Sequence, residues 1–352
     1  MYDIIIIGLG PAGAVFAKCL DRRFSVLAID KKSESGGFEK PCGGLLAPDA
    51  QKALASLGLN LPKDVLVDPQ IFSVRTIDLD SGIIKSYQRM YINLDRRKFD
   101  LWLMSQLPEN ISRATGTVTG ISKTDSGYRV TYTENGETKT AAAKYIIGAD
   151  GAKSAVRHFL APKFKTRTYL SVQQWFNDVN PTPFYSCIFD SKNTDCYSWS
   201  VSKDGSFIFG GAYPINGARQ AFERQKQTLA NLGFRFGKPT KTEACLVLRP
   251  RLTGSFCCGK DNVFLIGEAA GFISPSSLEG ISSAVISACK LAAVFNSRTP
   301  NMQSAYRSAV RGLRFKLAAK NFKNPFMYNK HLRKLVMSSG VKTIKVKGER
   351  DF

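Results

Sequence analysis

Several features that define other classes of protein are scarce in this sequence. It holds only two histidines, His158 and His331, and its eight cysteines show no C-x-x-C spacing. This composition argues against a His/Cys zinc site, and it disfavours a Ser-His or Cys-His hydrolase without excluding one. We therefore predict no metal site, and we expect the cysteines to be reduced thiols of a cytoplasmic protein.

Long apolar runs and a secretory leader are also lacking. No uninterrupted apolar segment approaches the ~20 residues needed to span a bilayer. The longest candidate, 281–295, is interrupted by Lys290, and the first residues contain Asp3 but no basic segment. These patterns predict neither a membrane-spanning helix nor a signal peptide. The expected location is the cytoplasm, with the inner face of the membrane as a candidate peripheral site.

Acidic residues are few, above all near the C-terminus. The chain carries 50 Lys and Arg against 28 Asp and Glu, which gives a net charge of +22. Residues 301–352 hold thirteen basic residues and two acids, so their net charge is 13 − 2 = +11. Such an excess indicates an anionic partner (nucleic acid, lipid head groups or a phosphorylated substrate) or else a solvated surface that aids solubility. We expect two basic amphipathic helices here, near 301–321 and 327–338.

The start of the chain contains a dinucleotide-binding pattern. Ile4–Ile7 predicts a buried strand, Gly8, Gly10 and Gly13 form G-x-G-x-x-G, and a second apolar run ends on Asp30. The first glycine permits a tight turn, the second lets backbone approach a pyrophosphate, and the third lets a helix pack closely on the strand. Asp30 would accept a hydrogen bond from an adenosine ribose. This order of elements favours a dinucleotide site over a glycine-rich turn that binds nothing.

Two further glycine motifs follow apolar runs. They are Gly-Ala-Asp-Gly at 148–151 and Gly-Glu-Ala-Ala-Gly at 267–271. Ser276 and Glu279 match a capping box, which predicts that a helix begins there and runs to about Phe295. The N-terminus of a helix is a site where negative charge is stabilised.

The segments between the motifs favour strands. Residues 71–92 alternate in polarity, and 169–254 is rich in strands and in aromatic residues, including Tyr197 and Trp199. Such aromatic strands either pack a core or form the wall of an apolar pocket. In the loop Pro41-Cys-Gly-Gly44, adjacent glycines indicate close approach of the backbone to a neighbouring group.

The three glycine motifs, together with Arg96, resemble the FAD-dependent enzymes of the para-hydroxybenzoate hydroxylase fold. Segments 41–44, 96–102 and 267–272 are further similar to the geranylgeranyl reductase branch. The resemblance implies an α/β (α+β) protein with a Rossmann-like FAD-binding domain, an inserted β-rich substrate domain and a helical C-terminal region. The predicted boundaries are 1–70, 93–168 and 255–300 for the first, 71–92 and 169–254 for the second, and 301–352 for the third.

The chain departs from the family pattern at two places. Glu268 stands where the family usually has an aspartate that contacts the FAD ribityl chain, and this change keeps the carboxylate. The substrate strand of the branch reads Tyr-x-Trp-x-Phe-Pro, and the first half is matched by Tyr197 and Trp199 but Val201-Ser202 replaces Phe-Pro. The second departure leaves the substrate open, because it falls on the substrate wall.

Residues of the glycine motifs, the 41–44 loop and the arginine position (Arg96, with Arg97 as its alternative) are assigned to FAD. The predicted cofactor-binding residues are Gly8, Gly10, Pro11, Ala12, Gly13, Asp30, Lys31, Cys42, Gly43, Gly44, Arg96, Val118, Asp150, Gly151, Gly267, Glu268, Pro275, Gly280 and Ile281. No catalytic residue is assigned, but Cys42, Tyr197 and Trp199 are candidates.

The resemblance implies an FAD-dependent oxidoreductase that reduces C=C bonds of an apolar isoprenoid or lipid substrate. The electron donor is open between NADPH, NADH and a reduced ferredoxin. Two alternatives remain: a flavin monooxygenase, either hydroxylase or halogenase, on the same fold, and a non-catalytic flavoprotein of the membrane surface. The expected partners are the substrate and, through 301–352, an anionic membrane surface; no nucleic acid is expected.

Overall fold

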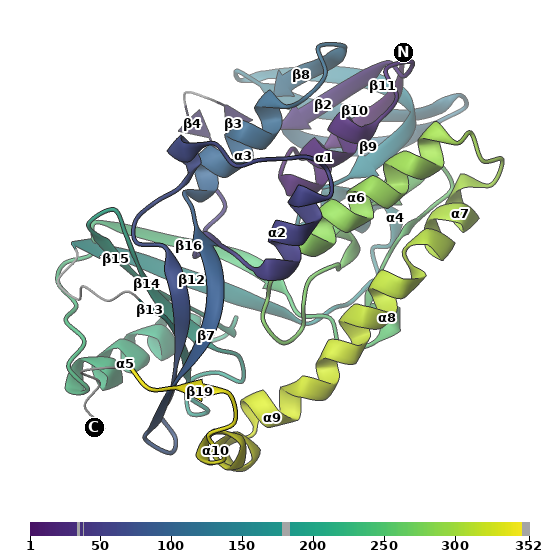
Figure 1. Ribbon diagram of the computed structural model, residues 1–352. Helices are drawn as coiled ribbons and strands as arrows, with labels where there is room; N and C mark the ends of the chain where they lie inside the picture. Colours follow the sequence, from purple (N-terminus) through teal and green to yellow (C-terminus); the bar gives the residue numbers. More distant parts are fainter. Residues whose placement is uncertain (34–35, 38, 178–183, 347–352) are drawn as a thin grey trace.

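The computed structural model describes residues 1–33, 36–37, 39–177 and 184–346, which form two large sheets and a row of C-terminal helices (Figure 1). The last six residues of the predicted C-terminal region, 347–352, lie outside this description. The predicted α/β class is confirmed. No helix among the described residues is long and apolar enough to cross a membrane.

The first sheet has eight strands and carries the N-terminal glycine motif. The strands are β1 (Tyr2–Ile7), β2 (Val26–Asp30), β8 (Ile111–Thr115), β9 (Thr117–Thr124), β10 (Gly127–Glu134), β11 (Glu137–Gly148), β17 (Gly259–Lys260) and β18 (Val263–Leu265). The order is β17-β18-β11-β1-β2-β8, with β10 paired to β11 and β9. β1 is parallel to both neighbours, and Ile4, Ile5 and Ile6 are fully buried, as a strand covered on both faces requires.

Helices cover this sheet and complete its core. α1 (Pro11–Cys19) packs against α6 (Ile281–Asn296), α2 (Pro48–Ala55) packs on α6, and α3 (Arg96–Ser105) packs on α1. α4 (Ala155–Leu160) instead packs on β9, β11 and β18. In α6 all residues from 281 to 295 except Lys290 are apolar or small, and Leu291 and Ala288 are fully buried. The segment is thus a core helix.

The second sheet has nine strands and is almost wholly antiparallel. Its order is β16 (Lys241–Leu248), β12 (Thr168–Asn177), β15 (Ser206–Pro214), β14 (Ser198–Lys203), β13 (Phe184–Phe189), β6 (Ile71–Asp78), β7 (Ile83–Asn93) and β19 (Thr343–Ile344), with β5 (Leu45–Leu46) also on β7. One face packs a phenylalanine cluster under α5 (Ala218–Asn231), and the other carries Trp199 and Tyr197. β5 and β19 belong to this sheet although they lie outside the ranges predicted for the substrate domain, 71–92 and 169–254. The predicted domain boundaries remain a prediction.

The C-terminal region is more broken than the sequence predicts. It contains α7 (Met302–Ala309), α8 (Arg311–Ala319), a 3-10 turn η4 (Lys320–Lys323), α9 (Asn324–Tyr328) and α10 (Lys330–Ser338). The expected helix over 301–321 is interrupted at Val310, shortly before Gly312, which is a poor helix former. α7, α8 and α9 run from the first sheet toward the second, where α10 lies (Figure 1).

The predicted capping box is wrong. α6 begins at Ile281, its N-cap is Gly280, and no side chain caps it. Residues 274–279 form a loop instead, in which the Ser274 N–H donates to the Glu279 carbonyl at 3.0 Å. The Glu279 carboxylate lies 3.6 Å from the Arg89 guanidinium of β7. It therefore pairs with a residue of the second sheet and does not cap the helix.

Candidate functional site

A cavity of about 850 Å³ lies between the two sheets, and all three glycine motifs reach it. Most of the residues assigned to FAD, and the three catalytic candidates, line this one space. They are Gly8, Gly10, Pro11, Ala12, Asp30, Lys31, Cys42, Gly43, Gly44, Arg96, Val118, Asp150, Gly151, Tyr197, Trp199, Glu268, Gly280 and Ile281. The structure therefore brings together groups that the sequence separates by up to 273 residues (281 − 8).

Three assigned residues, Gly13, Gly267 and Pro275, are not in the cavity lining. Gly13 packs so tightly that a Cβ there would collide with the Gly8 carbonyl, and a Cβ on Gly267 would lie 2.8 Å from that of Ala12. Pro275 accepts a hydrogen bond at its carbonyl from Arg249. Gly13 and Gly267 thus permit close packing of the motifs, and Pro275 holds the Arg249 side chain.

The N-terminal motif leaves a turn of helix open to the cavity. Gly8 has φ of +97°, a conformation that favours glycine, and Gly10 is the N-cap of α1. A Cβ on Gly10 would meet no atom within 4 Å, and no side chain caps the helix. The first-turn amides of α1 thus face free space in which an anion would be stabilised.

Asp30 holds the glycine turn as well as facing the cavity. One carboxylate oxygen accepts from the Leu9 N–H, and the other accepts from the Lys32 N–H at 2.7 Å. The Lys32 ammonium lies 3.6 Å from Asp30 and 3.5 Å from Asp100. The acid at the end of β2 is therefore already engaged with the backbone of the turn that it faces.

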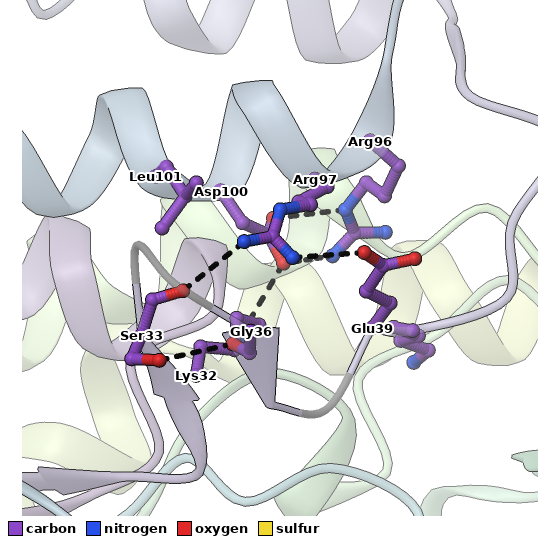
Figure 2. A pocket seen from close by; sticks show the side chains of 9 residues that line it. Lys32, Ser33, Gly36, Glu39, Arg96, Arg97, Asp100 and Leu101 are labelled. Carbon is purple, nitrogen blue, oxygen red and sulfur yellow. Dashed lines mark hydrogen bonds and ion pairs between the residues drawn. The ribbon is translucent and has the colours of Figure 1, made fainter.

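Arg96 and its neighbour Arg97 have different environments (Figure 2). Arg96 donates to Asp100 one turn further along α3 at 2.8 Å and lines the large cavity. Its pKa is raised: burial opposes the charge, but Asp100 outweighs burial. Arg97 instead pairs with Glu39 at 2.9 Å and is outside the cavity lining. Of the two alternatives, Arg96 faces the candidate site.

The third glycine motif is tied to the 41–44 loop by an ion pair. Lys40 donates to the Glu268 carboxylate, whose other oxygen accepts from the Leu248 N–H at 3.0 Å. Burial alone would lower the pKa of Lys40, but the Glu268 carboxylate raises it above its ordinary value. Arg157, one turn into α4, donates to the Ala269 carbonyl at 2.6 Å and so joins the middle motif to the third.

Asp150 of the middle motif carries a buried carboxylate oxygen without a partner. Its Oδ2 accepts from the amides of Ala155 at 2.7 Å and Val156 at 3.3 Å. Its Oδ1 is buried and has no hydrogen-bond partner among the described residues. Burial raises the pKa of Asp150 above its ordinary value. An acceptor in this state is suited to a donor group of a bound ligand.

Lys203 lies behind the 41–44 loop and fixes it to the second sheet. Its ammonium donates to Asn93 Oδ1 and to the Leu94 carbonyl, both at 2.6 Å, and to the Gly44 carbonyl at 3.4 Å. Burial lowers the pKa of Lys203 to about 8. Gly44 has φ of +61°, and a Cβ there would lie 2.6 Å from the Lys203 ammonium, so this close approach needs glycine.

Comparison with known proteins identifies the chain. A family model described as an FAD binding domain matches residues 104–311. Protein CbrA of an Escherichia coli O6:H1 strain is 49% identical over 343 residues, which cover 97% of this chain and 94% of that protein. The chain belongs to the CbrA family. The matched segment gives this chain an FAD binding domain, and FAD is the cofactor that the match supports.

Solved structures show which fold this chain shares. A geranylgeranyl bacteriochlorophyll reductase-like protein from Thermoplasma acidophilum superposes with a TM-score of 0.79 at 20% identity, covering 98% of this chain and 94% of that one. A triple mutant of a flavin-dependent brominase gives a TM-score of 0.70 at 18% identity, covering 96% and 94%. The chain therefore has the fold of these flavin-dependent proteins.

Aromatic residues form the wall of the cavity opposite the glycine motifs. The Tyr197 hydroxyl donates to the Ser277 carbonyl at 2.6 Å, and burial raises the pKa of Tyr197 well above its ordinary value. A Cβ on Gly43 would lie 3.5 Å from the Trp199 indole, so the loop of Cys42 packs directly on this ring. A Cβ on Gly210 would approach the ring to 2.8 Å, so glycine makes room for it there.

Other residues that line the cavity were not among the predicted site residues. The cavity is also lined by Lys40, Arg89, Tyr91, Tyr185, Cys187, Phe189, Glu279, Phe326, Met327, Arg333, Val336 and Met337. Lys40 directly precedes the 41–44 loop, and this position in the sequence indicated that it lies near the site. The residues of α9 and α10 gave none, because their position depends on ion pairs with β6 and its turn.

Proposed function

We propose that this protein uses FAD to reduce carbon–carbon double bonds in an isoprenoid or other lipid chain. The observation that carries the proposal is the continuity of the cavity. One wall is formed by the three glycine motifs and the other by aromatic and thioether side chains, within one space of about 850 Å³. Ligand sites are commonly ~300–1,000 Å³ and mostly apolar with a few polar groups, and this lining fits that description.

Three features of the glycine wall fit FAD. Gly10 and the uncapped start of α1 leave room and amides for a pyrophosphate, and Asp150 Oδ1 is a buried acceptor without a partner. The N-terminus of α6, at Gly280 and Ile281, also lines the cavity and has no side-chain cap. Its positive end would stabilise negative charge at the reactive end of the cofactor. When bound, FAD would supply the hydride transfer.

The aromatic wall would bind and orient the apolar chain. Tyr197, Trp199 and Tyr185 present ring surface to the cavity and exclude water from it. The raised pKa of Tyr197 keeps its hydroxyl protonated at neutral pH, so it would position rather than act as a base. Cys42 lies where the glycine and aromatic walls meet, and we propose it as a substrate contact.

The cofactor proposal has a direct test in a matched pair of variants. Purified protein should be yellow and release FAD on heating, and Gly10→Val should abolish the colour while its melting temperature stays close to that of wild-type apoprotein. The control is Gly237→Val, because a Cβ at Gly237 also meets nothing within 4 Å but lies outside the cavity. Colourless wild-type protein that cannot be reconstituted with FAD would overturn the proposal.

The reaction has its own test. Protein with bound FAD is reduced anaerobically with dithionite, freed of excess reductant, and mixed with geranylgeraniol. We expect reoxidation of the flavin together with a lipid product about two mass units heavier, as addition of a hydride and a proton requires. Replacing dithionite by NADPH, NADH or reduced ferredoxin in the same assay identifies the donor, for which we propose NADPH first.

The fold shared with a flavin-dependent brominase favours a second candidate, a flavin monooxygenase. In that case reduced protein should consume oxygen rapidly when an aromatic substrate is added, and geranylgeraniol should not reoxidise it anaerobically. If neither class of substrate changes the reoxidation rate, a non-catalytic flavoprotein is the better description.

A further inference from the structure

The C-terminal helices form a surface without acidic groups. Between Glu279 and Glu349 the chain contains no Asp or Glu. The basic side chains that are exposed on α8 to α10 and η4 are those of Arg311, Lys316, Lys323, Lys330 and Lys334. Such a one-sided distribution attracts anions, and the ion pair of Lys316 with Asp49 neutralises only one of these charges.

Large apolar side chains are exposed on the same helices. Seven of the fourteen exposed large hydrophobic residues in the described part of the chain lie between 315 and 344. The most exposed are Phe322 at 82%, Phe315 at 72% and Leu335 at 70%. Phe315, Phe322 and Phe326 are seven and four residues apart along the nearly continuous rod α8–η4–α9, so they lie approximately along one side of it. Leu313 and Leu317, which are buried, hold the other side against the core.

The cavity reaches the surface beside these residues. Phe326 and Met327 of α9 and Val336 and Met337 of α10 line it, and Phe326 and Val336 are also 54% and 48% exposed. The helices thus separate the interior of the cavity from solvent at this end. An apolar ligand that leaves or enters here would pass side chains that are themselves exposed and apolar.

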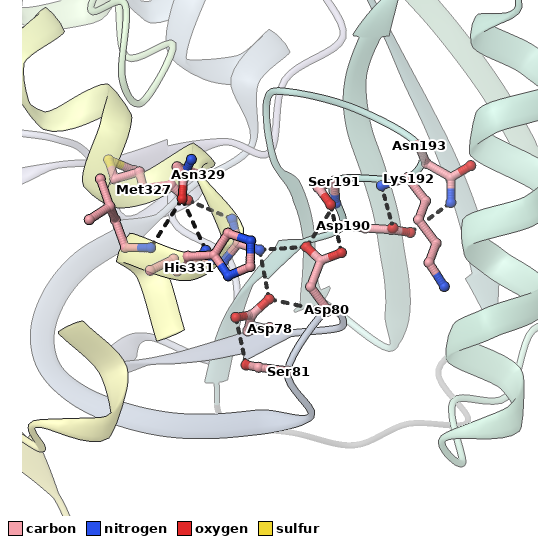
Figure 3. A network of polar contacts seen from close by, with 12 residues as sticks. Asp78, Asp80, Ser81, Asp190, Ser191, Lys192, Asn193, Met327, Asn329 and His331 are labelled. Atoms are coloured by element: carbon pink, nitrogen blue, oxygen red, sulfur yellow. Dashed lines mark hydrogen bonds and ion pairs between the residues drawn. The ribbon is translucent and has the colours of Figure 1, made fainter. Parts of the chain in front are cut away.

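The helices keep this position because α10 is locked to the second sheet. Arg333, which is 3% exposed, donates to Asp78 at 2.7 Å, to Asp80 at 2.5 Å and to the Met327 carbonyl at 2.9 Å. Figure 3 shows the carboxylates of Asp78 and Asp80 beside the turn between α9 and α10. β19 then pairs with β7, with Thr343 opposite Tyr87.

We propose that α8, η4, α9 and α10 dock the protein onto an anionic lipid bilayer, with Phe315 and Phe322 inserted among the acyl chains and the cavity opening toward the lipid. The basic side chains complement the anionic head groups. The bulky apolar side chains between them are stabilised when they leave water for the acyl-chain layer of a bilayer. A nucleic acid would satisfy the charges but leave Phe322 and Leu335 in water. The combination therefore favours a membrane.

Docking does not depend on the proposed reaction. Only the purpose of docking rests on that proposed function. A lipid chain dissolved in the bilayer would move along the apolar side chains of Phe326 and Val336 into the cavity without crossing water. Loss of membrane binding with intact flavin chemistry, or the reverse, separates the failure of one proposal from the failure of the other.

The test is cosedimentation of the full-length protein with vesicles. Vesicles of phosphatidylcholine with about one third phosphatidylglycerol should bind the protein at low salt, and pure phosphatidylcholine should bind it far more weakly. Phe315→Ser combined with Phe322→Ser should weaken binding at least tenfold. The control is Ile215→Ser, which removes an exposed apolar side chain outside these helices and should leave binding unchanged. Ile215 is 51% exposed and lies just before α5.

The charge contribution is tested separately. Lys323→Gln, Lys330→Gln and Lys334→Gln together should weaken binding by about a hundredfold, because each charge contributes about fivefold. Removing the same charge far from the helices, by Lys123→Gln, Lys163→Gln and Lys238→Gln, should have less than a tenth of that effect.

Three results would overturn the proposal: equal losses in the two triple variants, an unchanged affinity after loss of both phenylalanines, or tighter binding to a DNA duplex than to the vesicles at the same salt concentration. The last result would assign the surface to nucleic acid. The FAD content of every variant is measured in parallel, so that an unfolded variant is not mistaken for one that fails to bind.

Discussion

Replacing Arg333 by methionine should release α10 from the second sheet. The guanidinium bridges Asp78, which is fully buried, and Asp80, and after the change these carboxylates keep only Ser81, Ser191 and local amides as partners. Breaking a buried ion pair by removing one partner costs about 3–5 kcal/mol. We expect the lower value, about 3 kcal/mol, because the hydroxyl partners remain.

Urea unfolding of the full-length protein measures this cost, and limited trypsin digestion locates it. Cleavage after Lys330 and Lys334 should accelerate in the variant, since both lie in α10. The matched control is Arg333→Met combined with Asp78→Asn, which removes the uncompensated charge and should recover part of the loss. A change of less than about 1 kcal/mol in the single variant, or no coupling between the two sites, would refute the reasoning.

The same interaction predicts an acid limit. Burial would raise the pKa of Asp80, but hydrogen bonds from Ser191 and the charge of Arg333 hold it below its ordinary value of 3.8. Because the folded-state pKa is the lower one, the stabilisation is complete above pH 3.8 and is lost as the pH falls through the folded value. The stability difference between wild type and Arg333→Met should therefore shrink below pH 3.8.

Three more predictions concern the glycine wall and its supports. Gly13→Ala should destabilise the fold by about 3 kcal/mol in urea unfolding and abolish FAD binding, because its Cβ collides with the Gly8 carbonyl; unchanged stability would contradict the packing. Lys40→Met should cost about 3 kcal/mol and weaken FAD retention by leaving Glu268 unpaired, and adding Glu268→Gln should restore much of both. Burial lowers the pKa of Lys203 from 10.5 to about 8. Between these pH values the proton is bound only in the unfolded state, so the free energy of unfolding rises with pH, by up to roughly 3 kcal/mol. That rise, measured by urea midpoints at successive pH values, should be absent in Lys203→Met.

The sequence predicted those parts of the site that depend on local backbone. Gly8, Gly10 and Asp30 lie where their spacing requires, because strand, turn and helix form from neighbouring residues and leave few alternatives. The helix α5 (218–231) was also predictable, because its buried residues recur at helical spacing and form one face.

Contacts between distant charges were beyond such reasoning. Glu279 has a capping-box spacing from Ser276, yet Arg89 of β7 attracts it, 190 residues away (279 − 89). Lys40 with Glu268 and Arg333 with Asp78 are likewise pairs that no periodicity reveals. The enclosure of the cavity by α9 and α10 follows from the second of these pairs, so the sequence predicted basic helices there without showing that they line the site.

The strand order of the first sheet constrains how the protein is made. β1 leaves the ribosome early, but its neighbour β11 ends at Gly148, the next strand β18 ends at Leu265, and α6, which packs on α1, ends at Asn296. At roughly 5–20 residues per second, the 273 residues between Gly8 and Ile281 take on the order of 15–55 s to synthesise. For that interval the nascent chain exposes Ile4–Ile7 without a complete sheet. FAD loading must therefore wait until α6 has been made, and a chaperone that shields Ile4–Ile7 would raise the yield of the holoprotein.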